Sequence, residues 1–125
     1  MDTIERTCPL NGKVYKLRKI TESERIDAMV EFFFEIGVTS LFELHHLRNT
    51  IRTNLETGAA TQADKLKLAK IMQAENNQNK RLVKLSLVEP VIADELLVFG
   101  TPLFDWLMGE IITLNEVIET EKKTT

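Results

Sequence analysis

Residues 3–20 carry the alternating pattern of a β-hairpin. In the second arm, residues 13–20, basic and apolar side chains alternate with the period of two that a strand requires. Tyr15 and Leu17 fall on the same face of that arm. Between the arms, Asn11-Gly12 favours a turn because both residues tolerate positive φ. A lone hairpin is marginal in water, so we expect it to pack on helices or to pair with a neighbouring chain through an open edge.

A helix is predicted over residues 22–36. Thr21 and Glu24 form a capping box at its start, and Gly37 fits the position just beyond its end. At 100° per residue the apolar arc is about 200° wide, more than a one-sided core helix needs. Either the helix is central, or one flank of it is a binding surface. The predicted stripe comprises Ile26, Met29, Val30, Phe33 and Ile36, with Phe32 and Phe34 at its two edges.

Further helices are predicted along the rest of the chain. One spans residues 40–56, with Phe42 and His46 opposite a leucine-rich face. The next begins at Thr61 and is long, either unbroken or interrupted near 76–79, and residues 82–88 fit a helix or a strand. That leucine-rich face consists of Leu41, Leu44, Leu47, Ile51 and Leu55.

The C-terminal part is expected to hold a short helix and a long one. Proline disfavours α geometry in the residue before it but suits the first helical position, which predicts one helix over 91–99 and another over 103–119. A polar tail, residues 120–125, follows. Glu110 falls inside the apolar arc of the last helix and needs a partner or a rim position. That arc comprises Leu103, Trp106, Leu107, Ile111, Leu114, Val117 and Ile118, widened by Phe104 and Met108.

The predicted fold class is therefore mostly α, a multi-helix single domain over residues 1–119 with an N-terminal β-hairpin at 3–20 and helices over 22–119. A length of 125 residues, with 43% hydrophobic and 28% charged residues, is typical of one folded domain. No apolar run approaches the length of a membrane helix, which is roughly 20 residues. The first ten residues lack the apolar segment of a signal peptide, and one cysteine suits a reducing compartment.

Charge alternates along the chain in blocks, although the net charge is only −3. Acidic and basic blocks can pair within the fold, match those of another subunit or partner, or contact nucleic acid. The last role is unfavoured because the pI is about 5.4 and no aromatic residues interleave with the bases. The basic block contains Lys65, Lys67, Lys70, Lys80, Arg81 and Lys84.

The side chains that usually carry chemistry do not form a recognisable site. His45 and His46 are adjacent and point about 100° apart on a helix, so they cannot easily chelate one ion. Cys8 precedes a proline at a turn, without the base that an activated thiol needs. The acidic pairs lie at helix starts or on polar faces, where acids are electrostatically favoured. We therefore expect no catalytic residues, no metal, no cofactor and no enzymatic activity.

Aromatic residues give the better indication of function. Phe32, Phe33 and Phe34 are consecutive, so no single helix face can bury all three. One interpretation is a small core wrapped on several sides. The other is an exposed apolar surface for a protein partner or for self-association. The candidate partner-binding residues are Phe32, Phe34, Phe42, Met72, Phe104 and Met108, of which Phe34 and Phe104 are the most specific.

The chain resembles a known family. The segment PLNGKVYKLRKI over residues 9–20, the capped helix that begins TESER, the following helices, the aromatic-rich C-terminal helix and the polar tail are similar to the small tail assembly chaperones of long-tailed phages and prophages. The resemblance implies a non-enzymatic protein of the bacterial cytoplasm that binds the tape measure protein before the tail tube polymerises. The resemblance assigns a functional role to no individual residue of this chain. Two alternatives stay open: a virion structural or connector protein forming oligomeric rings, and a small DNA-binding regulator.

Overall fold

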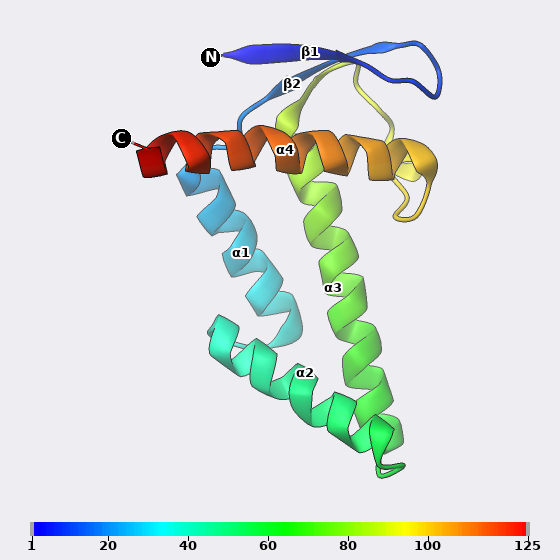
Figure 1. Cartoon of the computed structure of the whole chain (residues 1–125). Helices are drawn as coiled ribbons and strands as arrows, with labels where there is room; N and C mark the ends of the chain where they lie inside the picture. The colour runs from blue at the N-terminus through cyan, green and yellow to red at the C-terminus, as the bar shows by residue number, and fades with distance from the viewer. Residues whose placement is uncertain (1, 125) are drawn as a thin grey trace. The chain divides into compact units, whose positions relative to one another are not determined.

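The computed structural model describes the backbone of residues 2–124 and their side chains except those of 94 and 117–124. The fold is mostly α, as predicted (Figure 1). Its contacts cluster into two compact units, each described separately below. The sheet unit comprises residues 1–26 and 79–125, and the three-helix unit comprises residues 27–78. The expectation of one domain over residues 1–119 stays a prediction.

The predicted hairpin is confirmed. Strand β1 (Thr3–Thr7) pairs antiparallel with β2 (Val14–Arg18), and a third strand, β3 (Leu87–Glu89), pairs antiparallel with the other side of β2. In the loop, the Cys8 amide donates to the Lys13 carbonyl at 2.8 Å. Gly12 has a φ of +69°, a left-handed conformation that glycine adopts without steric cost. The strand order β1-β2-β3 leaves β1 at an edge of the sheet.

Helix α4 (Pro102–Thr124) covers the apolar face of the hairpin (Figure 1). Tyr15 and Leu17 are buried together, as the alternation predicts, whereas Val14 is exposed. The rings of Tyr15 and Trp106 pack with their centroids 5.6 Å apart. Near this interface, Arg6 of β1 forms an ion pair of 3.5 Å with Glu110, which gives that carboxylate the partner its position requires. The core is completed by Cys8, Ile20, Val83, Leu97, Phe104, Leu107, Ile111 and Leu114.

Helix α3 (Gln62–Ser86) is unbroken and leads directly into β3. Residues 82–88 are therefore helix up to Ser86 and strand from Leu87. The polar stretch near 76–79 does not interrupt the helix. Within it, Asn77 accepts a hydrogen bond of 3.2 Å from the side chain of Gln73, one turn earlier on the same helix. At the end of α3, the buried Ser86 hydroxyl donates to the Arg18 carbonyl at 2.6 Å and joins the helix to the end of β2.

The predicted helix over residues 91–99 is wrong. The Glu89–Pro90 peptide is cis, and the segment contains only a short 3₁₀ turn, η1 (Asp94–Leu96). Leu97 is the one buried apolar residue among the described side chains of this segment. Short helices depend on burying a continuous apolar face, and a single anchor does not provide one. The exposed apolar residues are Val91, Leu96, Val98 and Phe99.

The last helix extends beyond its predicted limit of 119, since α4 ends at Thr124. Its predicted apolar residues Val117 and Ile118 lie outside the described side chains. The predicted polar tail, 120–125, lies outside them as well.

Helix α1 (Glu22–Ile36) has the predicted bounds, and its start is fastened to the hairpin. The Glu24 amide donates to the Thr21 hydroxyl at 3.1 Å, and the Thr21 amide donates to the Glu24 carboxylate at 3.0 Å, which confirms the capping box. Arg18 of β2 binds the same carboxylate through two hydrogen bonds of 2.7 and 2.6 Å. The Arg18 guanidinium, together with the Thr21 amide, lowers the pKa of Glu24 from 4.5 to about 2.

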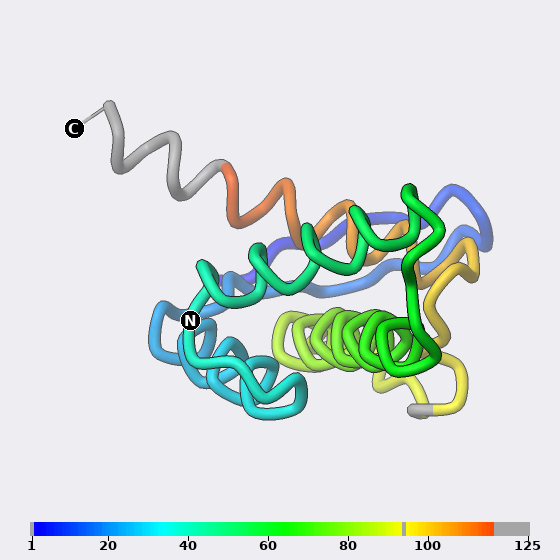
Figure 2. Tube along the Cα trace, turned by 90° about the horizontal axis from the view of Figure 1, so that it is seen from below, coloured from blue at the N-terminus to red at the C-terminus, as the bar shows by residue number. Residues whose placement is uncertain are grey.

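The three-helix unit combines α1 from Asp27, helix α2 (Leu41–Glu56) and α3 up to Gln78. Helix α2 runs from the end of α1 to the start of α3 (Figure 2). The fully buried centre is small, consisting of Leu44, Ile51 and Ile71. Leu41 and Leu55, the two ends of the predicted α2 face, are exposed. The residues packed around the centre are Phe32, Ile36, Val38, Leu47 and Leu68.

Polar contacts fasten α2 to α3. Arg48 forms an ion pair with Glu75, and the Asn54 side chain donates to Asp64 at 3.1 Å. Asp64 also accepts the Thr61 amide at 3.1 Å, and this bond, followed by the one from Asn54, lowers the pKa of Asp64. These contacts set the position of α2 although the apolar centre is small.

The burial of Phe104 predicts a large effect of its removal on stability. We expect Phe104→Ala to lower the free energy of unfolding by about 3–5 kcal/mol, because a fully buried ring is lost and a cavity remains. Phe42→Ala is the matched control, since Phe42 is 80% exposed, and it should change stability by less than about 0.5 kcal/mol. Denaturant unfolding followed by circular dichroism measures both variants. Equal effects would contradict the assignment of the core.

The lowered pKa of Glu24 predicts a pH dependence of stability. Because the folded pKa, about 2, lies below the ordinary 4.5, the contribution of the ionised carboxylate is complete above pH 4.5. It is lost as the pH falls from 4.5 towards 2. Glu24→Gln keeps the capping geometry but should lower the free energy of unfolding at pH 7. In this variant the free energy of unfolding should also decrease less between pH 4.5 and pH 2.

The measurement for this variant is urea unfolding at a series of pH values between 2 and 7. Glu56→Gln, which removes one negative charge from the end of α2, controls for net charge. A wild-type and a Glu24→Gln profile that stay parallel throughout this range would contradict the assigned role of the Arg18–Glu24 pair.

Candidate protein-binding surface

Helix α1 exposes the side that its sequence predicts to be the core stripe. Met29 is 42% exposed, Val30 60% and Phe34 87%, and the Phe33 side chain is half-buried. These four residues, called the α1 apolar face below, occupy one side of the helix at about 100° per residue. Ile26, in the first half of α1, is also exposed. The predicted stripe is therefore wrong as a core face at Ile26, Met29 and Val30, whereas its last member, Ile36, packs against the centre of the three-helix unit.

The opposite side of α1 makes the core contacts. Ala28, Phe32 and Ile36 recur every four residues and therefore lie in one row along the helix. Ala28 is buried, and the other two pack against the centre of the three-helix unit. The candidate Phe32 is thus part of the core packing, with its ring 6.1 Å from that of Phe33. Ala28 is small, so hydrophobicity alone does not reveal this row.

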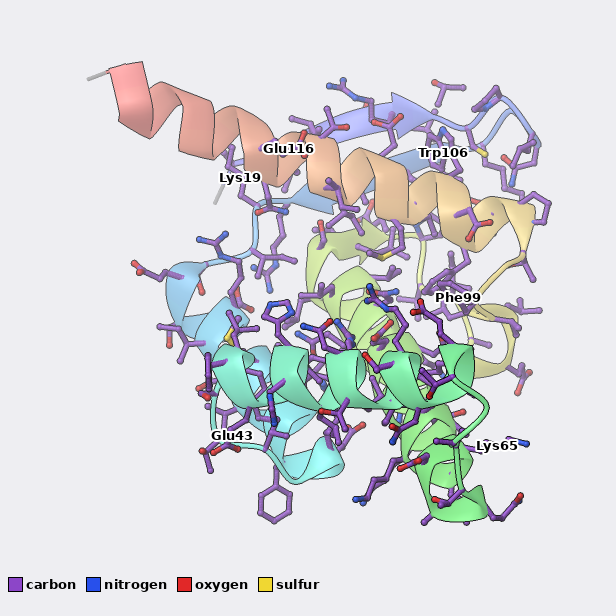
Figure 3. The ribbon with its side chains drawn as sticks, turned by 60° about the horizontal axis from the view of Figure 1, so that its bottom comes forward. Lys19, Glu43, Lys65, Phe99, Trp106 and Glu116 are labelled. Carbon is purple, nitrogen blue, oxygen red and sulfur yellow. The ribbon has the colours of Figure 1, made fainter. Side chains whose placement is uncertain are left out.

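The turn between α1 and α2 is held by local hydrogen bonds. Gly37 ends α1 with a φ of +87°, and its amide donates to the Phe33 carbonyl at 2.8 Å. Ser40 caps α2 by accepting the Glu43 amide at 3.2 Å. The Glu43 carboxylate accepts the Thr39 amide at 2.9 Å and the Thr39 hydroxyl at 2.8 Å, which lowers the pKa of Glu43. Figure 3 labels Glu43 at this end of α2.

Two exposed phenyl rings flank this turn. Phe34 lies in the last turn of α1, and Phe42 lies in the first turn of α2, 80% exposed. The Phe42 ring stacks on His46, with centroids 6.5 Å apart and planes 7° apart, which limits its orientation. Aromatic side chains on a fixed scaffold lose little conformational entropy when a partner binds them. The exposure of Phe34 and Phe42 agrees with the prediction that both lie off the core.

The other candidate residues have different environments. Met72, on α3 in the three-helix unit, is 58% exposed. Phe104 is completely buried, so the expectation that it lies off the core is wrong. The spacing of the buried α4 positions is the signal that could have found it, because Phe104, Leu107, Ile111 and Leu114 follow one another at intervals of three, four and three residues.

Met108 is half-buried and lines a pocket in the sheet unit with a volume of about 200 Å³. The wall is mostly apolar, with Ile20, Leu82, Ile111 and Ile112 beside Met108. Arg25, Asn115 and Glu116 complete it. Figure 3 labels Glu116 on α4, on the same helix as Trp106.

Sequence reasoning missed a second exposed apolar segment in the sheet unit. Val91 is 93% exposed, and Leu96 and Phe99 are also exposed. Phe99 lies in the connection before α4 (Figure 3), where its ring meets Phe104 edge-on at 6.3 Å. The prediction of a helix over this segment concealed the exposure, since a helix would have directed part of it inwards.

The chemistry-bearing side chains lie apart from one another. Cys8 is buried in the core of the sheet unit, and His45 and His46 are exposed on α2. Among the residues that the structure describes, no group of three or more His, Cys, Asp or Glu side chains is arranged to hold a metal ion. Within the same residues, no helix combines the length and the apolar character needed to cross a membrane.

Two of the basic residues of the three-helix unit lie on different sides of α3. Lys65 and Lys67 lie about 200° apart around α3, and both are exposed. Lys65 is near the start of the helix (Figure 3). A phosphate backbone is bound by bases gathered on one side of a domain, and this pair is not arranged in that way.

The chain was compared with protein-family models, with curated proteins and with solved structures, and nothing matches in any of the three comparisons. Any assignment of function therefore depends on the surface itself and on the resemblance described above.

The α1 apolar face and Phe42 predict binding of a hydrophobic dye. We expect the folded protein to enhance the fluorescence of anilinonaphthalene sulfonate, because accessible apolar surface binds this dye. Phe34→Ser combined with Phe42→Ser should remove most of the enhancement while the circular dichroism spectrum stays unchanged. Leu10→Ser, which removes one exposed apolar side chain from the hairpin loop, is the control. If the double variant kept the wild-type fluorescence enhancement, the apolar surface that binds the dye would lie elsewhere on the protein.

Proposed function

We propose that this protein is a non-enzymatic tail assembly chaperone of a long-tailed phage or prophage, which binds the tape measure protein in the bacterial cytoplasm before the tail tube polymerises. The observation that carries the proposal is the α1 apolar face together with Phe42. The resemblance of residues 9–25 and of the element order to this family supports the same conclusion.

The shape of the surface suits a helical partner. Met29 and Phe33 form one row along α1, and Val30 and Phe34 form the neighbouring row, since each pair is four residues apart. Two adjacent rows create the groove into which the ridge of another helix packs. An amphipathic helix of the partner would therefore lie along α1, with the apolar side of the partner helix facing the groove. Phe42 would add an aromatic contact beyond the end of the groove.

The energetics suit a chaperone that must later release its client. Fully burying one phenylalanine side chain contributes about 1.5–3 kcal/mol. Part of the gain from Phe34, Phe42 and the two aliphatic residues is offset by the entropy lost on association. The net affinity of such a small surface is moderate, which allows polymerising tail subunits to displace the chaperone.

The proposal predicts that the tape measure protein stays soluble only with an intact surface. On co-expression, the wild-type chain should keep the tape measure protein in the soluble fraction and co-purify with it. Phe34→Ala combined with Phe42→Ala should weaken binding at least tenfold, because losing the burial of two rings exceeds about 1.4 kcal/mol. Affinity is measured by titrating the soluble complex in a biosensor experiment.

Leu66→Ala is the matched control for that experiment. Leu66 is 63% exposed on α3 but does not belong to the α1 apolar face, so binding should be unchanged. Full binding by the double variant, with its fold intact, would refute the surface assignment. A tape measure protein that remains insoluble with the wild-type chain would refute the proposed function itself.

A virion structural or connector protein is the second candidate, and one observation favours it. Strand β1 has an unpaired outer edge, and such an edge can pair with a strand of another copy. A connector should form a defined ring in light scattering and remain in purified particles. A chaperone should be absent from them.

A further inference from the structure

Negative charge borders the exposed apolar residues of the three-helix unit. Residues 27–47 contain four acidic residues and no lysine or arginine. Asp27 is exposed and lies three residues before Val30, so it is a neighbour of the apolar face on the surface of α1. Glu43 is exposed next to Phe42 in the first turn of α2. The α1 apolar face and Phe42 therefore have a carboxylate near each end.

The charge at the turn between α1 and α2 is fixed in place. The Glu43 carboxylate accepts hydrogen bonds from the amide and the hydroxyl of Thr39, two neutral donors that leave its charge uncompensated. The last turn of α1 contains no basic residue, so the partial negative charge at its carbonyl end has no cation of that helix beside it. The other two acids of this segment, Glu31 and Glu35, make contacts within the protein. A group that covers Phe42 therefore comes close to negative charge.

This charge discriminates between the occupants that an apolar helix face could receive. A second copy would bring its own Asp27 and Glu43 to the same surface, and like charges placed together at an interface disfavour association. An anionic lipid surface attracts basic segments and repels acidic ones. A helix with lysine or arginine beside its apolar side carries the opposite charge and meets neither obstacle.

We propose that the α1 apolar face and Phe42 bind an amphipathic helix whose apolar side is bordered by lysine or arginine residues. The proposal rests on the proposed function for the identity of the protein that supplies this helix. The apolar side of the helix would cover Val30 and Phe34, and its cations would lie near Asp27 and Glu43. Charge pairs at the rim of an interface contribute mainly to specificity and association rate, and salt screens them.

The test measures the binding of three synthetic helical peptides to the full chain by fluorescence anisotropy. The peptides share one leucine side and a length of about 18 residues, or five helical turns, and their polar side carries lysine, glutamine or glutamate. At low ionic strength the lysine peptide should bind about tenfold more tightly than the glutamine peptide, and the glutamate peptide should bind most weakly. Salt at about 1 M should remove these differences. Equal binding of the lysine and glutamine peptides at low ionic strength would overturn the proposal.

Paired variants locate the charge preference on this surface. Asp27→Asn combined with Glu43→Gln should reduce the preference for lysine over glutamine by about threefold or more, with the affinity for the glutamine peptide unchanged. Glu56→Gln combined with Glu95→Gln is the matched control, because it removes two exposed acids outside residues 27–47 and should keep the preference. An equal loss in both double variants would overturn the proposal, since attraction to the net charge of the chain would then explain the binding.

A charge reversal provides a second measurement should the first double variant not fold. Asp27→Lys should weaken binding of the lysine peptide and strengthen binding of the glutamate peptide. Unchanged affinities for both peptides would overturn the proposal.

Co-expression with the tape measure protein separates this proposal from the proposed function. A tape measure protein that is kept soluble equally well by the wild type and by Asp27→Lys would overturn the basic helix as ligand and leave the proposed function intact. A tape measure protein that stays insoluble, together with the expected peptide preferences, would refute the proposed function and support the basic helix as the ligand class.

Discussion

The packing of α4 on the buried face of β2 is the contact on which the sheet unit depends. A two-stranded hairpin is not stable by itself, and Tyr15 and Leu17 are buried in a core to which α4 contributes Phe104, Leu107, Ile111 and Leu114. Once β2 is held, its other edge can pair with β3, and its last carbonyl can accept the Ser86 hydroxyl. The same strand end presents Arg18 to the first turn of α1. One apolar interface thus sets the end of α3 and the start of α1.

Element bounds were predictable from the sequence wherever a local signal defines them. The Thr21–Glu24 capping box and Gly37 give both ends of α1, because each signal acts through hydrogen bonds or backbone angles within a few residues. Ser40 and Thr61 define the starts of α2 and α3 in the same way. The segment 91–99 was misjudged because proline and glycine mark where a helix can begin and end, but they do not supply the buried face that stabilises it.

The choice of buried side was not predictable from periodicity. On α1 the hydrophobic residues Ile26, Met29, Val30 and Phe34 are exposed, and the row that packs contains the small residue Ala28 together with Phe32 and Ile36. Phe104 is the opposite case. The sequence predicts it at the margin of the apolar arc of the last helix, yet it is completely buried in the core that α4 shares with the sheet. Burial depends on which face meets another element, and a single helix does not encode that choice. Phe34 and Phe42, both predicted to lie off the core, are exposed, whereas Phe32, predicted by the same reasoning, packs against the centre of the three-helix unit.

The small centre of the three-helix unit explains why its apolar surface can serve a function. Only Leu44, Ile51 and Ile71 form the fully buried cluster, and polar contacts such as Arg48–Glu75 fasten α2 to α3. Phe32 and Ile36 supply the α1 contacts to this centre, and Met29, Val30 and Phe34 stay exposed. Exposed phenylalanine promotes aggregation without stabilising the fold, so packing within this unit does not explain why Phe34 is 87% exposed. Met29, Val30, Phe34 and Phe42 are therefore apolar positions that the packing of this unit leaves uncovered.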